Sequence, residues 1–181
     1  MLHLKNITAG NPKTAEQYQM TKQHGITWLF SEDDKNWYEE LKNFASDTIK
    51  MVYTGDGRVV WVGKDVTGIE PRNASVIEVP DITANRRITV PGYWFYRDDK
   101  FVFDYKLKAE DERDALLQQA SIMTSEWEKD LLLGLISDED REKLKAYRIY
   151  AKSLQAMDFN IITDKTSYNA IEWPVSPEAS S

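Results

Sequence analysis

Glycine is distributed very unevenly along this 181-residue chain, because seven of its eight glycines precede residue 109. In that front part they separate short runs of Trp, Tyr, Val and Ile, a pattern typical of short strands joined by turns. Residues 109–181 are instead rich in Glu, Lys, Leu and Ala, which favour helix. The sequence therefore predicts an α+β protein with a β-rich domain over residues 1–108 and a helical domain over residues 109–181.

The charge divides at the same point. Residues 1–108 contain 15 basic and 15 acidic side chains, whereas residues 109–181 contain 8 basic and 15 acidic ones and supply the whole formal charge of −7. Affinity for a phosphate backbone depends on clustered Lys and Arg. We therefore expect no nucleic-acid partner.

The chain has no cysteine, which excludes disulfides, thiolate metal sites and cysteine-dependent catalysis. Its start, Met1–Ile7, lacks the charged and then apolar pattern of a signal peptide, and no apolar run approaches the ~20 residues of a membrane span. We expect neither secretion by the usual route nor membrane insertion.

Two β-hairpins are predicted in the front part. In the first, Ile49–Tyr53 and Val59–Val62 flank a loop whose two glycines permit positive φ. In the second, Tyr93–Tyr96 and Phe101–Phe103 flank a short charged loop. The Gly-containing loop makes the first hairpin the clearer of the two.

The rest of the front part predicts a further strand, a small helix and two interrupted strands. Ile26–Phe30 is expected to form a strand, and Ser31–Asp34 to cap a helix. The apolar residues of that helix recur at helical spacing: Trp37, Leu41 and Phe44. Pro71, Pro80 and Pro91 are expected to shorten strands 75–79 and 87–90 or to place them at sheet edges.

The back part predicts an antiparallel helical hairpin followed by an extended arm. The first helix is expected to begin at the acids of 109–112 and to end at Gly134; its apolar face comprises Leu116, Ala120, Met123, Trp127 and Leu131. Ser137 is expected to cap the second helix, whose apolar face comprises Leu144, Tyr147, Ala151 and Leu154. From Asp158 onward the helical periodicity is lost, and Pro174 favours an extended Trp173.

No catalytic or metal-binding motif is present. The segment from Gly57 to Lys64 has five residues between its glycines and Asp65 after its lysine, so it departs from a phosphate-binding loop at two positions. The two histidines lack metal-site spacing, and the three acidic clusters lie where helices are expected to start, which dipole compensation explains. No carboxylate pair has the spacing of a hydrolase. We expect no enzyme activity, no cofactor and no metal.

The aromatic residues are the positive signal. Seven of them lie within Tyr93–Tyr105, and on a hairpin the side chains of Tyr93, Trp94 and Tyr96 cannot all face one core. Aromatic side chains are frequent interface anchors, although core packing explains any one of them equally well. The same two alternatives apply to Trp173, which either packs back on the helices or engages a partner.

The C-terminal residues carry a family resemblance. Leu133–Asp140, the Tyr147-Arg148-Ile149 segment after Leu144, and Ile171–Pro174 with Pro177 resemble the tail fibre assembly proteins of tailed bacteriophages and prophages. The resemblance covers about the last 70 residues well and the front only through the neighbourhoods of Trp37 and Tyr93.

The resemblance implies a non-enzymatic chaperone that binds the distal C-terminal region of a trimeric tail fibre in the host bacterial cytoplasm. Some relatives stay on the virion at the fibre tip, so the alternative is an adhesin that contacts host surface glycan. Either the β-rich front or the helices with the Trp173 arm would bind the fibre, and self-association is left open. The candidate partner-binding residues are Tyr93, Trp94, Tyr96, Tyr147, Arg148 and Trp173.

Overall fold

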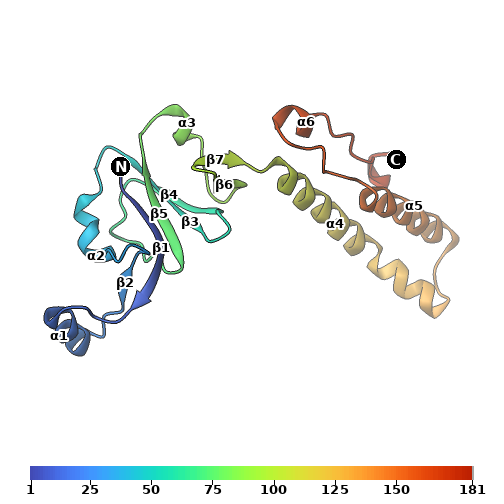
Figure 1. Ribbon diagram of the computed structural model, residues 1–181. Coiled ribbons are helices and arrows are strands. Elements are labelled where there is room, and N and C mark those ends of the chain that lie inside the picture. The colour runs from blue at the N-terminus through green and yellow to red at the C-terminus, as the bar shows by residue number, and fades with distance from the viewer. Residues whose placement is uncertain (181) are drawn as a thin grey trace. The chain divides into compact units, whose positions relative to one another are not determined.

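The computed structural model describes the backbone of residues 1–180 and the side chains of residues 1–178. The chain forms two compact units, Met1–Phe103 and Asp104–Ser181 (Figure 1). The first is built mainly from antiparallel strands and the second from helices, which confirms the predicted α+β class with its helical hairpin.

The first unit contains a five-stranded antiparallel sheet in the order β2-β1-β5-β3-β4. Its strands are β1 (His3–Gly10), β2 (Trp28–Phe30), β3 (Ile49–Thr54), β4 (Val59–Gly63) and β5 (Ala74–Val79). The first strand of the chain therefore lies inside the sheet, between β2 and β5. Neither β1 nor helix α1 (Ala15–His24) was assigned from the sequence, because both are mostly polar.

Both predicted hairpins are confirmed. In the β3–β4 hairpin the amide of Thr54 donates to the carbonyl of Arg58 (2.9 Å), and Gly57 adopts φ 89°, as the turn requires. Strands β6 (Trp94–Arg97) and β7 (Lys100–Phe103) form the second hairpin as a separate two-stranded sheet. The amide of Tyr96 donates to the carbonyl of Gly57 (2.7 Å), which fastens this hairpin to the first.

The expectation that prolines would shorten strand 75–79 or place it at an edge is wrong. Strand β5 is the central strand and pairs with β1 on one side and β3 on the other. Pro71 and Pro80 lie outside its ends, so no residue from Ala74 to Val79 lacks an amide hydrogen.

Two other local expectations are also corrected. Residues 87–90 do not form a strand; they follow the short helix α3 (Thr83–Arg86), and the amide of Ile88 donates to the carbonyl of Asn85 (3.2 Å). Helix α2 (Trp37–Glu40), which continues into a 3-10 turn (Leu41–Asn43), is capped by the Asn36 side chain and not by a residue of 31–34.

Apolar side chains cover both faces of the sheet. One face places Leu4, Val52 and Val76 against Trp37 and Leu29. The other face places Met51, Val59 and Val79 against Ile88 and Trp94. Trp94 is 8% exposed, so the β6–β7 hairpin covers the sheet with its tryptophan.

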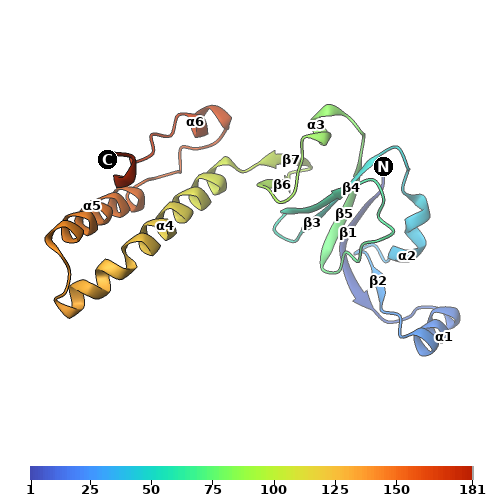
Figure 2. The ribbon, with the colours of Figure 1, turned by 180° about the vertical axis from the view of Figure 1, so that it is seen from behind.

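The second unit consists of helix α4 (Tyr105–Leu133), helix α5 (Asp138–Gln155), the short helix α6 (Lys165–Asn169) and a 3-10 turn (Pro177–Ser180) (Figure 2). Helix α4 begins one turn before the expected acidic cluster, because the Asp104 carboxylate accepts a hydrogen bond from the amide of Leu107 (2.9 Å) and caps it. No helix within residues 1–180 is long and apolar enough to span a membrane.

The link between the two long helices is formed as predicted. Gly134 ends α4 in the left-handed conformation (φ 70°), and the amide of Leu135 donates to the carbonyl of Asp130 (2.8 Å). Ser137 caps α5 by accepting from the amide of Asp140 (3.1 Å). The tight link forces α4 and α5 to run antiparallel.

Candidate functional site

Tyr147 lies at the centre of the contact between α4 and α5. Its ring is buried with Ala120 of α4, and its centroid is 6.0 Å from that of Trp127 and 6.5 Å from that of Tyr150. The small side chain of Ala120 lets the ring approach the opposite helix. This position follows from the predicted apolar faces of both helices, which the structure brings together.

The C-terminal arm packs back on the helices, and Trp173 takes part in this packing. The Trp173 ring lies 5.7 Å from that of Phe159 and joins the apolar cluster around Tyr147 and Leu154. It is half-buried. Trp173 therefore contributes to the cohesion of this unit.

Polar contacts fasten the arm to the first half of α4. The Tyr168 hydroxyl donates to Glu112 Oε1 (2.6 Å), and Lys108 Nζ lies 4.2 Å from the centroid of the Tyr168 ring. Burial and the neighbouring Glu112 carboxylate raise the pKa of Tyr168. Lys106 Nζ donates to Asn160 Oδ1 (2.7 Å). The arm is therefore held through α6 and the loop before it.

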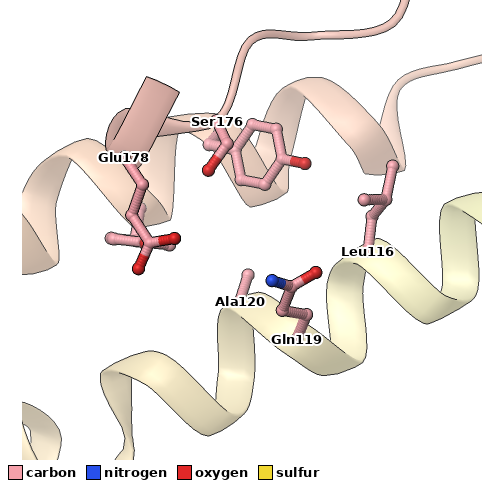
Figure 3. A pocket seen from close by; sticks show the side chains of 7 residues that line it. Leu116, Gln119, Ala120, Ser176 and Glu178 are labelled. Atoms are coloured by element: carbon pink, nitrogen blue, oxygen red, sulfur yellow. The ribbon is translucent and has the colours of Figure 1, made fainter. Parts of the chain in front are cut away.

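Two adjoining cavities open beside Tyr147, and together we call them the Tyr147 groove. The first, of about 370 Å³, is lined by Leu116, Gln119, Ala120, Tyr147, Tyr150, Ser176 and Glu178. Figure 3 shows side chains of α4 facing Ser176 and Glu178 of the arm across this cavity. The second, of about 590 Å³, is lined by Met123, Trp127, Glu139, Glu142, Lys143, Ala146, Tyr147, Pro177 and Glu178.

The Tyr147 groove combines an apolar floor with an acidic rim. Met123, Trp127 and Ala146 line its apolar part, whereas three acids and Lys143 line its polar part; Lys143 Nζ lies 2.7 Å from Glu139, and Glu178 belongs to the arm. Burial and then the hydrogen bond to the Glu178 carboxylate raise the pKa of Tyr147. The groove is suited to an apolar side chain that carries a donor or a positive charge.

Arg148 lies on the other side of the interhelical contact. It is exposed and borders a separate cavity of about 210 Å³, together with Thr124 and Glu128. Tyr147 lines this cavity as well, so Tyr147 and its neighbour Arg148 both border it. The structure thus places Tyr147 and Trp173 in one cluster and Arg148 beside it.

The candidate residues of the front part lie in the first unit. Trp94 belongs to the core, and the half-buried Tyr93 ring lies 6.0 Å from that of Phe103. The Tyr96 ring lies between those of Tyr53 (4.9 Å) and Phe101 (5.0 Å). Burial and the nearby Asp99 carboxylate raise the pKa of Tyr96 to about 12. These aromatic residues pack mainly on one another.

Sequence reasoning missed the parts of the site that come from the arm. The arm turns back toward the helices and so brings Tyr168 to α4, and Ser176 and Glu178 to Tyr147. No local pattern in the sequence indicates this turn. Met123 and Trp127 were predicted to lie on the apolar face of α4, but not to border a cavity. No group of three or more His, Asp or Glu side chains within the described residues is arranged to hold a metal ion.

Comparison with known proteins gives a consistent result. Residues 39–178 match the family model described as Caudovirales tail fibre assembly protein, lambda gpK. The chain is 47% identical to tail fiber assembly protein U' of Escherichia phage Mu and 45% identical to that of Escherichia phage P1. It is 39% identical to a probable tail fiber assembly protein of Escherichia phage P2. Each alignment covers 98% of this chain and 100% of the relative.

Proposed function

Because the chain belongs to the Caudovirales tail fibre assembly protein family, we propose that it is a chaperone for a trimeric phage tail fibre. It binds the distal C-terminal region of the fibre and promotes its folding and assembly without catalysing a reaction. The observation that carries this proposal is the family match, which runs from the first unit through the helical hairpin into the arm. The names of the relatives state assembly of tail fibres as their role.

The physical need for such a partner follows from trimer assembly. Chains that must pair with one another expose unpaired strand edges and apolar surface until assembly is complete, and such surfaces aggregate. A protein that covers them during that interval raises the yield of trimer. We place this activity in the host cytoplasm, where the fibre chains are synthesised.

The helical unit offers the better surface for this task. Its Tyr147 groove is open and largely apolar, whereas the candidate residues Trp94 and Tyr96 of the first unit pack in the core or on other rings. We propose that the groove accepts an apolar side chain of the fibre, with Glu178 at the rim receiving a basic neighbour.

The test is co-expression of the C-terminal fragment of the fibre with and without this protein. The proposal expects a higher yield of soluble trimer in its presence and a complex that survives gel filtration. An unchanged trimer yield, together with the absence of a complex, would contradict it. Purified virions also need to be probed for the protein, because an adhesin would persist there and bind host glycan without the fibre.

The groove has its own test within the same assay. Met123→Glu places a negative charge on the exposed edge of the apolar floor, where the Met123 side chain is not part of the core. It is expected to weaken the complex by about tenfold, because a charge would be buried against an apolar group. Met20→Glu, at a comparably exposed methionine of the first unit, is the matched control and is expected to leave the affinity unchanged.

A further inference from the structure

Four leucines are exposed at the tip of the helical hairpin. The exposed fractions of their side chains are 47% for Leu131, 87% for Leu132, 70% for Leu133 and 71% for Leu135. None of them belongs to an apolar cluster of the second unit. Monomeric proteins rarely expose contiguous apolar surface of this kind unless it binds something. Packing within the unit therefore does not explain these leucines.

The tip is an ordered structure. The amide of Gly134 donates to the carbonyl of Leu131 (3.2 Å), and the amides of Leu135 and Ile136 both donate to the carbonyl of Asp130 (2.8 and 3.2 Å). Ile136 is buried, and Ser137 starts the next helix directly. In many such helix ends the residue after the glycine packs on the last helical turn. Here Leu135 points its side chain to the surface instead.

The leucines surround the end of α4. Three consecutive residues of a helix point in directions about 100° apart, so Leu131, Leu132 and Leu133 cover most of the circumference of the last turn. No single flat surface can cover all three. The tip therefore fits a concave apolar surface that closes around it.

The charges around the tip indicate the nature of the partner. Residues 126–145 contain seven acidic and four basic side chains. Each of the four bases lies close to an acid of its own helix. The distances are 2.5 Å between Lys129 and Glu126, 2.7 Å between Lys143 and Glu139, and 3.6 Å between Arg141 and Asp138. Lys145 is likewise 3.6 Å from Glu142. The net charge of the residues around the leucines is therefore negative.

A second copy of the chain is a poor match for this surface. Two tips in contact would bring two negative surpluses together around their leucines, and like charges at an interface oppose association. In a partner with an apolar hollow and a basic rim, the rim would be attracted to the acids that surround the leucines.

We propose that the leucine tip (Leu131, Leu132, Leu133 and Leu135) is a docking surface for an apolar, basic-rimmed hollow on the tail fibre protein. This inference rests on the proposed function, because that function supplies the fibre as the partner. It adds a second contact with the fibre that is separate from the Tyr147 groove. The acids on either side of the tip attract the basic rim of the partner and so orient this contact.

The test replaces leucines at the tip in the full chain. The variant Leu132→Gln/Leu133→Gln/Leu135→Gln is compared with the wild type for affinity toward the purified C-terminal fragment of the fibre. We expect a loss of about tenfold or more, since central apolar anchors dominate most interfaces. The control is Ile149→Gln, because Ile149 is 60% exposed on α5 and lies outside the tip. Its affinity is expected to match the wild type.

A charge variant tests the nature of the partner. Asp130→Lys is expected to weaken the complex several-fold at low salt, and the wild-type affinity is expected to fall as salt is added, because salt screens the attraction between opposite charges. Circular dichroism of each variant checks that the helices are intact, so that a loss of affinity reports on the surface alone.

The outcomes separate the two proposals. If the wild type binds the fragment and the triple variant binds it equally well, the docking surface is wrong while the chaperone function stands. If the wild type elutes as a dimer that the triple variant abolishes, the leucines join two copies and the inference is overturned. If the wild type neither binds the fragment nor raises the trimer yield, the proposed function itself fails.

Discussion

At the scale of single residues, two buried charged side chains stand out in the first unit. Lys50 of β3 and Glu78 of β5 lie opposite each other in the sheet and are 1% and 5% exposed. Lys50 Nζ donates to the carbonyl oxygens of Ala45 and Thr48. The Glu78 carboxylate accepts from the amides of Leu2 (2.9 Å) and Ala45 (2.7 Å). The pair ties the N-terminus and the loop before β3 to the central strand.

Glu78→Gln is expected to destabilise the first unit by about 1–3 kcal/mol, because buried donors lose a charged acceptor. Thermal and denaturant unfolding measure this change. Glu70→Gln is the control, since Glu70 forms only an exposed ion pair with Arg72 and such pairs contribute about 0–1 kcal/mol. Equal effects of the two variants would show that Glu78 is not a structural anchor.

The pH dependence of stability gives a second test of Glu78. Burial opposes its ionisation, but hydrogen bonds from Thr48, Leu2 and Ala45 outweigh it and hold the pKa below the usual 4.5. The unfolded chain therefore binds this proton more readily. The stabilisation is complete above pH ~4.5 and is lost as the pH falls through the lower folded value. In Glu78→Gln, this part of the acid-induced loss of stability is expected to disappear.

At the scale of elements, the link between α4 and α5 depends on two cap residues. Gly134 adopts φ 70°, and an added β-carbon would contact no neighbouring atom. The cost of a side chain there is therefore the strain of the left-handed backbone alone. Gly134→Ala is expected to destabilise the helical unit by about 1 kcal/mol, and Ser137→Ala by about 1 kcal/mol. Gly134→Asn is the matched control, because Asn tolerates this conformation better. Chemical unfolding followed by circular dichroism measures all three; equal losses for Ala and Asn would exclude backbone strain as the cause.

The arm depends on the hydrogen bond between Tyr168 and Glu112. Tyr168→Phe keeps the ring and removes the donor, so Glu112 loses its partner on α6. We expect proteolysis within residues 156–178 to accelerate about fivefold, the factor that corresponds to ~1 kcal/mol for one hydrogen bond. Tyr18→Phe, at an exposed tyrosine of α1, serves as the control. An unaltered cleavage rate in Tyr168→Phe would mean that the apolar contacts of Trp173 hold the arm unaided.

Elements were predictable from the sequence where local chemistry fixes them. The Gly57 turn, the Gly134 end and the Ser137 cap each depend on residues adjacent in the chain, and all three formed as expected. The central place of β5 was not predictable in this way, because its neighbours β1 and β3 come from distant segments. The Tyr147 groove was hidden for the same reason, since Glu178 reaches it only through the returning arm.

At the scale of the whole molecule, each unit has its own apolar cores. The two clusters of the first unit contain only residues up to Phe103, and the two of the second contain only residues from Tyr105 onward. We expect fragments 1–103 and 104–181 to fold separately, each with a cooperative thermal transition. Circular dichroism and calorimetry of the purified fragments test this. A fragment that stays unfolded alone would show that its cores depend on the other unit.

The place of β1 within the sheet has a consequence for how the protein is made. Strand β1 pairs with β2 within about the first 30 residues, but its other partner is β5, where His3 lies opposite Ile77. At synthesis rates of ~5–20 residues per second, β1 leaves the ribosome several seconds before β5. During that interval Leu4 and Ile7 are exposed to solvent, although both are fully buried in the finished sheet. Under the proposed function, the protein passes during its own synthesis through the same state of unpaired strands that it would cover in the fibre chains.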